Sequence, residues 1–234
     1  MLRNRGTVMF ALVLLVAAGS AHAVNLDVPA RHLMPAASGY QSPEVFDPAE
    51  AALEMELLHQ RLWESSAEAV PIDLGPLSED ERARLEDPFA SSEMKMLVGI
   101  DRDLDAAVDP VLWSLPGLKA TQSRIGGAHT LYDGTFVWTA VLRSPGATAV
   151  RAHLSDIDLP AGAKLYAYSP AGEAFGPYAN GPRGDHQVWT NTVAGDTLML
   201  QLELEGPVTR EQLHGSWFVI DSLGHMGPQF QLAA

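Results

Sequence analysis

The sequence predicts a mostly β protein, an antiparallel β-sandwich of the jelly-roll or Greek-key type that is preceded by an acidic helical segment. The first observation behind this prediction is a series of short apolar runs, rich in Val, Leu, Trp and Tyr, between Thr135 and Asp196. The second is the cluster of Pro, Gly or Asp that ends each run, as happens between antiparallel strands. The third is their spacing of about ten residues, which is typical of sandwiches.

The first 23 residues have the pattern of an export signal. A basic leader precedes an apolar run from Val8 to Ala18, and Ala21-His22-Ala23 has the small-x-small pattern of a cleavage site. We therefore expect cleavage after Ala23, a secreted or periplasmic location, and no membrane attachment after cleavage. The apolar run is shorter than the roughly 20 residues of a spanning helix. An uncleaved N-terminal anchor stays open as the alternative.

An extended leader is expected over residues 24–46, and an acidic helical and linker segment over residues 47–92. Asp47 and Pro48 are typical of the start of a helix that ends before Pro71. The apolar face of this helix is predicted to consist of Leu53, Leu57, Leu58 and Leu62. We expect the segment to lie against its own β-domain or to stay mobile, rather than to dock on a partner.

A second capping box begins at Ser78 and predicts a short helix before Pro88. The β-sandwich domain is expected over residues 93–227, followed by a C-terminal tail over 228–234. The stretch from Asp101 to Ala120 is predicted to be a loop. Strands are expected near 94–100, 122–130, 135–143, 148–156, 163–169, 173–178, 186–192, 196–205 and 216–225.

Charge and composition exclude several classes of function. The formal net charge is −14 at pH 7, which argues against nucleic acid or an anionic membrane surface as a partner. The imbalance is local, because residues 24–110 hold 19 acidic and six basic residues, whereas residues 111–234 hold ten and seven. The chain has no cysteine. Disulfides, thiol nucleophiles and thiolate zinc sites are therefore excluded.

Four short motifs of the predicted sandwich carry a family resemblance. They are the run from Trp138 to Ala147, Leu159-Pro160-Ala161-Gly162-Ala163, Gly176-Pro177-Tyr178, and Trp189-Thr190 with Gly195-Asp196. Together they resemble the non-catalytic N-terminal region of secreted bacterial trypsin-like serine peptidases of the lysyl endopeptidase-like kind. The resemblance covers roughly residues 94 to 226. It implies a role beside a peptidase domain, in cis or in trans, and a serine endopeptidase as the full-length parent.

The catalytic motifs of that family do not occur in this chain. The sequence has no Thr-Ala-Ala-His-Cys-like segment for the general base and no Gly-Asp-Ser-Gly-Gly-like segment for the nucleophile. We therefore predict a non-catalytic chain, either a truncated precursor or a stand-alone copy of the accessory region. Assisting folding, restraining activity before processing, and binding a surface or substrate are the roles that the resemblance implies.

The rival hypothesis is a free-standing extracellular module that binds carbohydrate or another surface. Tyr166 and Tyr168 lie two residues apart and share one face of a predicted strand, so they are candidates for a ring platform. Trp138, Tyr178 and Trp189 are further rings of the same region. Core packing is the alternative interpretation, above all for Trp138, which lies among alternating apolar residues.

Two weaker patterns concern metals and catalysis. Asp101, Asp103, Asp105 and Asp109 match the opening of an EF-hand loop, but Ala106 and Leu112 replace its required Gly and Glu. No cofactor is therefore predicted, and a calcium site of another kind is left open. His153 and Ser155 suggest a hydrolase as a third hypothesis, but no Gly-x-Ser-x-Gly motif occurs. A polar strand face is the favoured interpretation.

Overall fold

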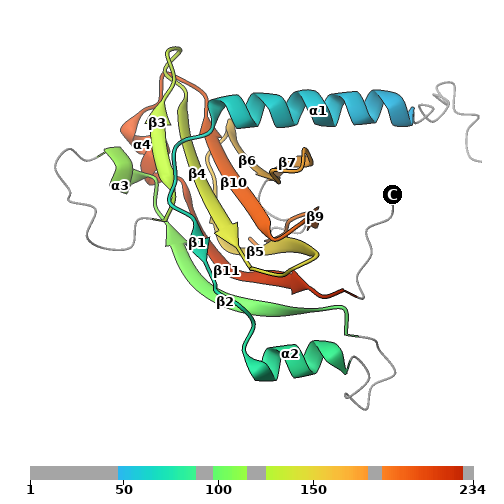
Figure 1. Cartoon of the computed structure of the whole chain (residues 1–234). Helices are drawn as coiled ribbons and strands as arrows, with labels where there is room; N and C mark the ends of the chain where they lie inside the picture. The colour runs from blue at the N-terminus through green and yellow to red at the C-terminus, as the bar shows by residue number, and fades with distance from the viewer. Residues whose placement is uncertain (1–46, 88–96, 115–124, 179–185, 229–234) are drawn as a thin grey trace, which may run out of the picture. The chain divides into compact units, whose positions relative to one another are not determined.

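Two β-sheets face each other across an apolar core in the part of the chain that the computed structural model describes, which is residues 47–87, 97–114, 125–178 and 186–228 (Figure 1). The fold is mostly β, and its two predominantly antiparallel sheets form a sandwich. The predicted signal, its cleavage at Ala23, the extended leader and residues 229–234 of the tail lie outside the described residues.

Sheet A has the order β1-β4-β10-β6-β7, and β3 also pairs with β4. Its strands are β1 (Ile72–Asp73), β3 (Gly127–Thr130), β4 (Phe136–Arg143), β6 (Ala163–Tyr168), β7 (Ala174–Tyr178) and β10 (Thr197–Leu204). β1 runs parallel to β4, while the other described pairings are antiparallel. β1 and β3 pair with different halves of β4, so two short strands share one edge of this strand.

Sheet B has the order β2-β11-β5-β8, and β9 also pairs with β5. Its strands are β2 (Gly99–Val108), β5 (Ala149–Asp158), β8 (Val188–Trp189), β9 (Val193–Ala194) and β11 (Trp217–Met226). The strands predicted near 135–143, 148–156, 163–169, 173–178, 196–205 and 216–225 are therefore confirmed. The strand predicted near 186–192 is instead two strands of two residues each.

The core between the sheets is centred on large side chains from both. Trp138 of β4 and Phe218 of β11 are fully buried and meet edge to face, with ring centroids 5.5 Å apart. The Trp138 Nε1 atom donates a hydrogen bond to the Ile125 carbonyl oxygen at 2.9 Å, so the polar atom of this ring is satisfied. The predicted burial of Trp138 is confirmed.

The predicted loop from Asp101 is wrong in its first half, because β2 continues to Val108. Aspartate is disfavoured in strands, but here Asp101, Asp103 and Asp105 are exposed and alternate with residues that face the core. Ala106 and Val108 supply the buried side. The period of two therefore outweighs the low strand propensity of Asp101 and Asp103. Asp105 lies at a register shift with a φ of 46°, a left-handed conformation in which aspartate is enriched.

Four helices accompany the described strands: α1 (Pro48–Ser65), α2 (Glu79–Glu86), α3 (Val111–Ser114) and α4 (Arg210–His214). α1 begins as predicted, since the Asp47 carboxylate caps it by accepting from the Ala49 N–H at 2.9 Å. α2 begins with the predicted capping box between Ser78 and Glu81. The two shortest helices, α3 and α4, were not predicted.

The predicted apolar face of α1 is only half right. Leu62 is fully buried and Leu58 is partly buried against sheet A. Leu53 and Leu57 are 54% and 56% exposed. Leu53 precedes Leu62 by nine residues, which is about two and a half turns of an α-helix, so the two leucines lie on opposite sides. The leucines therefore divide between a buried and an exposed side.

The segment that follows α1 joins sheet A. The Ala67 N–H donates to Thr139 Oγ1 at 2.9 Å, and Ile72 pairs with Leu142 as the start of β1. The described part of the acidic segment, residues 47–87, therefore lies against its own β-domain. No helix among the described residues is long and apolar enough to cross a membrane.

Candidate functional site

The outer face of sheet A is covered by α1, which crosses strands β10 and β6 (Figure 1). Tyr166 and Tyr168 share this face, as the sequence predicts. They are 5% and 0% exposed, because they pack with Leu62 of α1 in a small second core. These two residues are therefore not an exposed platform, and the prediction of a sugar platform there is wrong for this structure.

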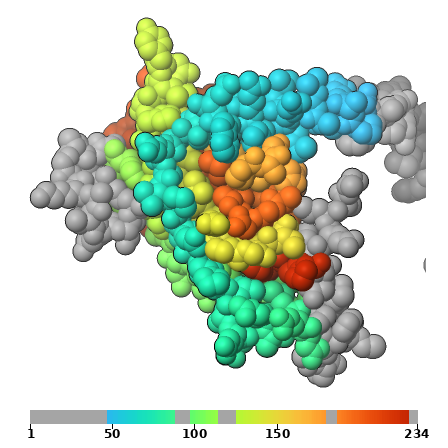
Figure 2. All heavy atoms as spheres, viewed as in Figure 1, coloured from blue at the N-terminus to red at the C-terminus, as the bar shows by residue number. Residues whose placement is uncertain are grey.

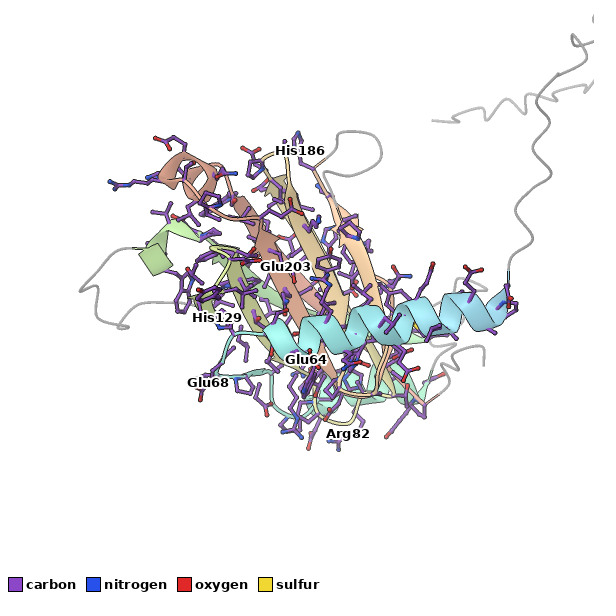
Figure 3. All side chains as sticks on the ribbon, turned by 90° about the horizontal axis from the view of Figure 1, so that it is seen from above. Glu64, Glu68, Arg82, His129, His186 and Glu203 are labelled. Atoms are coloured by element: carbon purple, nitrogen blue, oxygen red, sulfur yellow. The ribbon has the colours of Figure 1, made fainter. Side chains whose placement is uncertain are left out.

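A polar network joins α1 to the strands beneath it. The buried Gln201 side chain accepts from the Tyr168 hydroxyl at 2.9 Å, and it donates to Ser65 Oγ and to Glu203 Oε1, both at 2.9 Å. Arg61 of α1 donates to both oxygens of the Glu203 carboxylate, at 2.8 and 2.7 Å. Figure 3, seen from above, shows Glu203 beside α1 near Glu64. Helix and sheet are thus matched in polar as well as apolar groups.

The protonation states agree with this network. Burial raises the pKa of Tyr168 above its ordinary value, so the phenol keeps its proton and donates it to Gln201. Partial burial acts to lower the pKa of Arg61, but the hydrogen bond and the charge of Glu203 raise it overall. The ion pair of Arg61 with Glu203 therefore persists over the whole range in which the Glu203 carboxylate is ionised.

The outer side of α1 is uncovered by any described segment in Figure 2, where the helix is blue. Leu53 and Leu57 lie on this side, one turn apart. The exposed acidic residues of the helix surround them: Glu50, Glu54, Glu56 and Glu64. Figure 3 also labels Glu68, which follows the helix. We name this set of two leucines and the glutamates of α1 the outer face of α1.

A groove of about 510 Å³ lies beside the C-terminal end of α1. Charged residues from the helix and sheet A line it, namely Arg61, Asp133, Lys164, Glu203 and Glu205. Lys164 pairs with Glu205 and Arg61 pairs with Glu203, so each cation of the groove already has an anionic partner. The groove is therefore a polar border of the helix interface.

The outer face of sheet B carries the polar pair that suggested a hydrolase. Ser155 Oγ donates to Asp221 Oδ1 at 2.8 Å, and His153 Nδ1 lies 3.0 Å from Asp221 Oδ2. A nucleophilic triad requires the histidine to lie between the serine and the acid. Here the serine proton goes to the carboxylate itself, so this geometry does not activate Ser155 as a nucleophile.

The same face carries an exposed ring. Trp189 of β8 is 38% exposed and lies directly opposite His153 of β5 in the strand register. The His153 ring stacks on it with centroids 4.6 Å apart, and the Arg151 guanidinium carbon lies 4.3 Å from its centroid. Trp189 is one of several aromatic residues that stand out in this part of the sequence. No sequence pattern indicates that Asp221 and Arg151 are its neighbours.

The four aspartates that suggested calcium do not converge. Asp101 and Asp103 are successive outward residues of β2, and such residues are about 7 Å apart. Asp105 lies at the register shift of this strand, with a φ of 46°. The described residues contain no group of three or more His, Asp or Glu side chains arranged to hold a metal ion. Asp109 has another role, since its carboxylate accepts from the Val111 N–H at 3.0 Å.

A buried serine–histidine pair lies where the two sheets meet at one end. Ser144 Oγ and His225 Nδ1 are 2.9 Å apart, and both side chains are buried. Arg102 donates to Ser144 Oγ at 3.0 Å and to the carbonyl oxygens of Leu74 and Gly75 at 2.9 and 2.8 Å. This cluster fixes the segment after β1, and its burial keeps substrate away from the serine.

Comparison with known proteins adds no relative: no family model, no curated protein and no solved structure matches this chain.

Proposed function

We propose that the chain is a secreted or periplasmic, non-catalytic accessory region of a trypsin-like serine peptidase of the lysyl endopeptidase-like kind. It acts on a peptidase domain in cis or in trans. The observation that carries the proposal is the outer face of α1, where Leu53 and Leu57 are exposed among glutamates on a helix that the sandwich holds in place.

The chemistry of this face favours a protein partner. Two leucines one turn apart form an apolar contact of the kind that anchors a helix in a groove. The glutamates around them favour a partner with basic residues at the border of that groove, and such complementarity speeds encounter. Because Arg61 and Leu62 fix the helix to the sheet, little conformational entropy is lost when the partner binds.

We also propose the jelly-roll type for the sandwich. The connections from β4 to β5, β5 to β6, β7 to β8, β9 to β10 and β10 to β11 each pass from one sheet to the other. This alternation supports a jelly-roll winding rather than two consecutive meanders.

The first experiment is the intact mass of the product that the natural host secretes. A product heavier than the 25.1 kDa of this chain, with peptidase sequence in its peptide map, is expected for a role in cis. A product at or below that mass makes the role one in trans. Binding of the chain to a purified bacterial lysine-specific trypsin-like peptidase then tests the role in trans.

Two variants locate the contact. Leu53→Ala with Leu57→Ala should raise the dissociation rate by at least about tenfold, as loss of a buried anchor does. Changing Glu54, Glu56, Glu64 and Glu68 to Gln should slow association at low salt and reduce its salt dependence. Tyr132→Ala is the control, because Tyr132 is fully exposed on the turn between β3 and β4. Binding that both variants leave unchanged would contradict the proposed contact.

A further inference from the structure

We propose that the outer face of sheet B is a second site, which binds a neutral carbohydrate through Trp189, Arg151 and Asp221. This site is separate from the outer face of α1, and it does not depend on the proposed function. Its residues come from three neighbouring strands, β8, β5 and β11.

The ring is the first component of the site. Trp189 remains 38% exposed although two side chains pack against it. The contacts to His153 and Arg151 hold the indole in one orientation, so its exposed surface costs little entropy to use. A pyranose has apolar C–H groups, which can pack on the part of the indole that His153 and Arg151 leave exposed while its hydroxyl groups stay free for hydrogen bonds.

Hydrogen-bonding groups lie beside the ring. The Asp221 carboxylate contacts Ser155 and His153 with one oxygen each. A carboxylate has about four acceptor positions, so Asp221 keeps capacity for sugar hydroxyl groups. Its orientation is fixed by these two neighbours, as a binding group requires.

Arg151 supplies donors. Its stem lies over Gly224 of β11, where an added Cβ would come within 3.2 Å of Arg151 Cγ. The guanidinium lies over Trp189, and Arg151 Nε is enclosed without a hydrogen-bond partner. Among the described residues the Arg151 side chain has no hydrogen-bond partner, so its packing on the ring positions it. An arginine that is ordered but unpaired on a sheet face has its outer N–H groups available to a ligand.

The charges of the face select a neutral ligand. Asp101 and Asp103 of β2 are exposed on the same side of the sheet, in register with Gly224 and Ser222 of β11. Together with Asp221 they repel an anionic ligand. A cationic ligand would compete with Arg151 for the ring. Hydroxyl groups, in contrast, donate to the carboxylates and accept from the guanidinium.

The test is binding of the full chain to an array of neutral oligosaccharides of the gluco, xylo, manno and N-acetylchito series, followed by titration calorimetry with the strongest binder. We expect binding of at least one series. Trp189→Ala should weaken it by at least about tenfold, and Asp221→Asn should weaken it by a smaller factor. Trp63→Ala is the matched control, because Trp63 on α1 is also exposed, at 48%.

Three outcomes would overturn the site. They are no binding to any neutral series, binding that Trp189→Ala leaves unchanged, and equal loss in Trp63→Ala. The thermal unfolding midpoint of each variant reports its folding. If Trp189→Ala does not fold, the Asp221→Asn variant and Arg151→Gln decide the question, since both act on the exposed polar groups of the face. Neither this failure nor this success bears on binding to a peptidase through α1.

Discussion

The outer faces of the two sheets have a similar chemistry but opposite surroundings. On sheet A, Gln201, Glu203 and Tyr168 are buried beneath α1, and helix and strands satisfy their polar groups. On sheet B, Asp101, Asp103 and Trp189 remain exposed. Helix α1 covers the outer face of sheet A. No described segment covers Asp101, Asp103 and Trp189 on the outer face of sheet B.

The comparison shows that polar residues on the outer face of a sheet can contribute either to stability or to binding. A polar group that is buried and fully paired specifies one arrangement of helix and sheet. A polar group that is exposed beside an ordered ring adds little to stability and stays available to a ligand. Substitutions on sheet A should therefore change the stability of the fold, and substitutions on sheet B should change binding.

We expect the largest loss of stability from a substitution between α1 and sheet A. Leu62→Ala removes a fully buried side chain between α1 and sheet A, and it should lower the free energy of unfolding by about 2–5 kcal/mol. Leu53→Ala in the same helix is the control and should change it by less than about 0.5 kcal/mol. Urea denaturation measures both. Equal effects of the two variants would mean that α1 does not pack as described.

We expect a smaller loss of stability when a buried polar group of sheet A is removed, and a still smaller one for an exposed polar group of sheet B. Gln201→Ala leaves the buried Tyr168 hydroxyl without the amide oxygen that accepts its proton. It should lower the free energy of unfolding by about 1–3 kcal/mol, the usual cost of a buried unsatisfied group. Ser155→Ala on sheet B removes a hydrogen bond at the surface and should change it by about 0.5 kcal/mol or less. A larger loss for Ser155→Ala than for Gln201→Ala would reverse the assignment of the two faces.

We expect the smallest change in stability from the protonation of His225, at the end where both sheets meet. Burial, and then the charge of Arg102, lowers the pKa of His225 below its ordinary value of 6.5, although the charge of Glu81 acts against this. The unfolded chain therefore takes up a proton before the folded chain does, so stability falls as the pH drops below about 6.5. Above that pH His225 adds no pH dependence.

The measurement is the free energy of unfolding from pH 5 to 8 for the natural chain and for His225→Asn, whose Oδ1 atom can accept from Ser144. The variant should have a shallower loss of stability between pH 6.5 and 5. Identical slopes would show that His225 does not titrate in this window.

Much of the fold is predictable from local patterns. The alternation in Phe136–Arg143 and Ala163–Tyr168 predicts strands because their apolar residues recur every second position. The aspartates of β2 hide the same alternation, since each one alone favours a turn. The spacing of the α1 leucines predicts a single apolar face of the helix. Only the packing of α1 on sheet A shows that Leu58 and Leu62 face the sheet and that Leu53 and Leu57 are exposed.

The sites depend on contacts that local patterns do not contain. Tyr166 and Tyr168 share a face as expected, but their burial follows from α1, which is more than 100 residues earlier in the sequence. Asp221 reaches His153 and Ser155 at a register shift in β11, and no residue type marks that shift. Trp189 lies on a strand of two residues, which is too short to give a periodic signal.

The edges of the sheets have a consequence for the association of one copy of the chain with another. A bare edge strand offers unpaired backbone groups to a second copy and so invites aggregation. β7 ends sheet A and carries Pro177, which has no N–H to donate. β2 ends sheet B with Asp101, Asp103 and Asp105, whose like charges repel the same edge of another chain. The aspartates that resemble a calcium loop thus oppose pairing of β2 with another copy, and neutralising them with Asn should promote growth of the sheet between molecules.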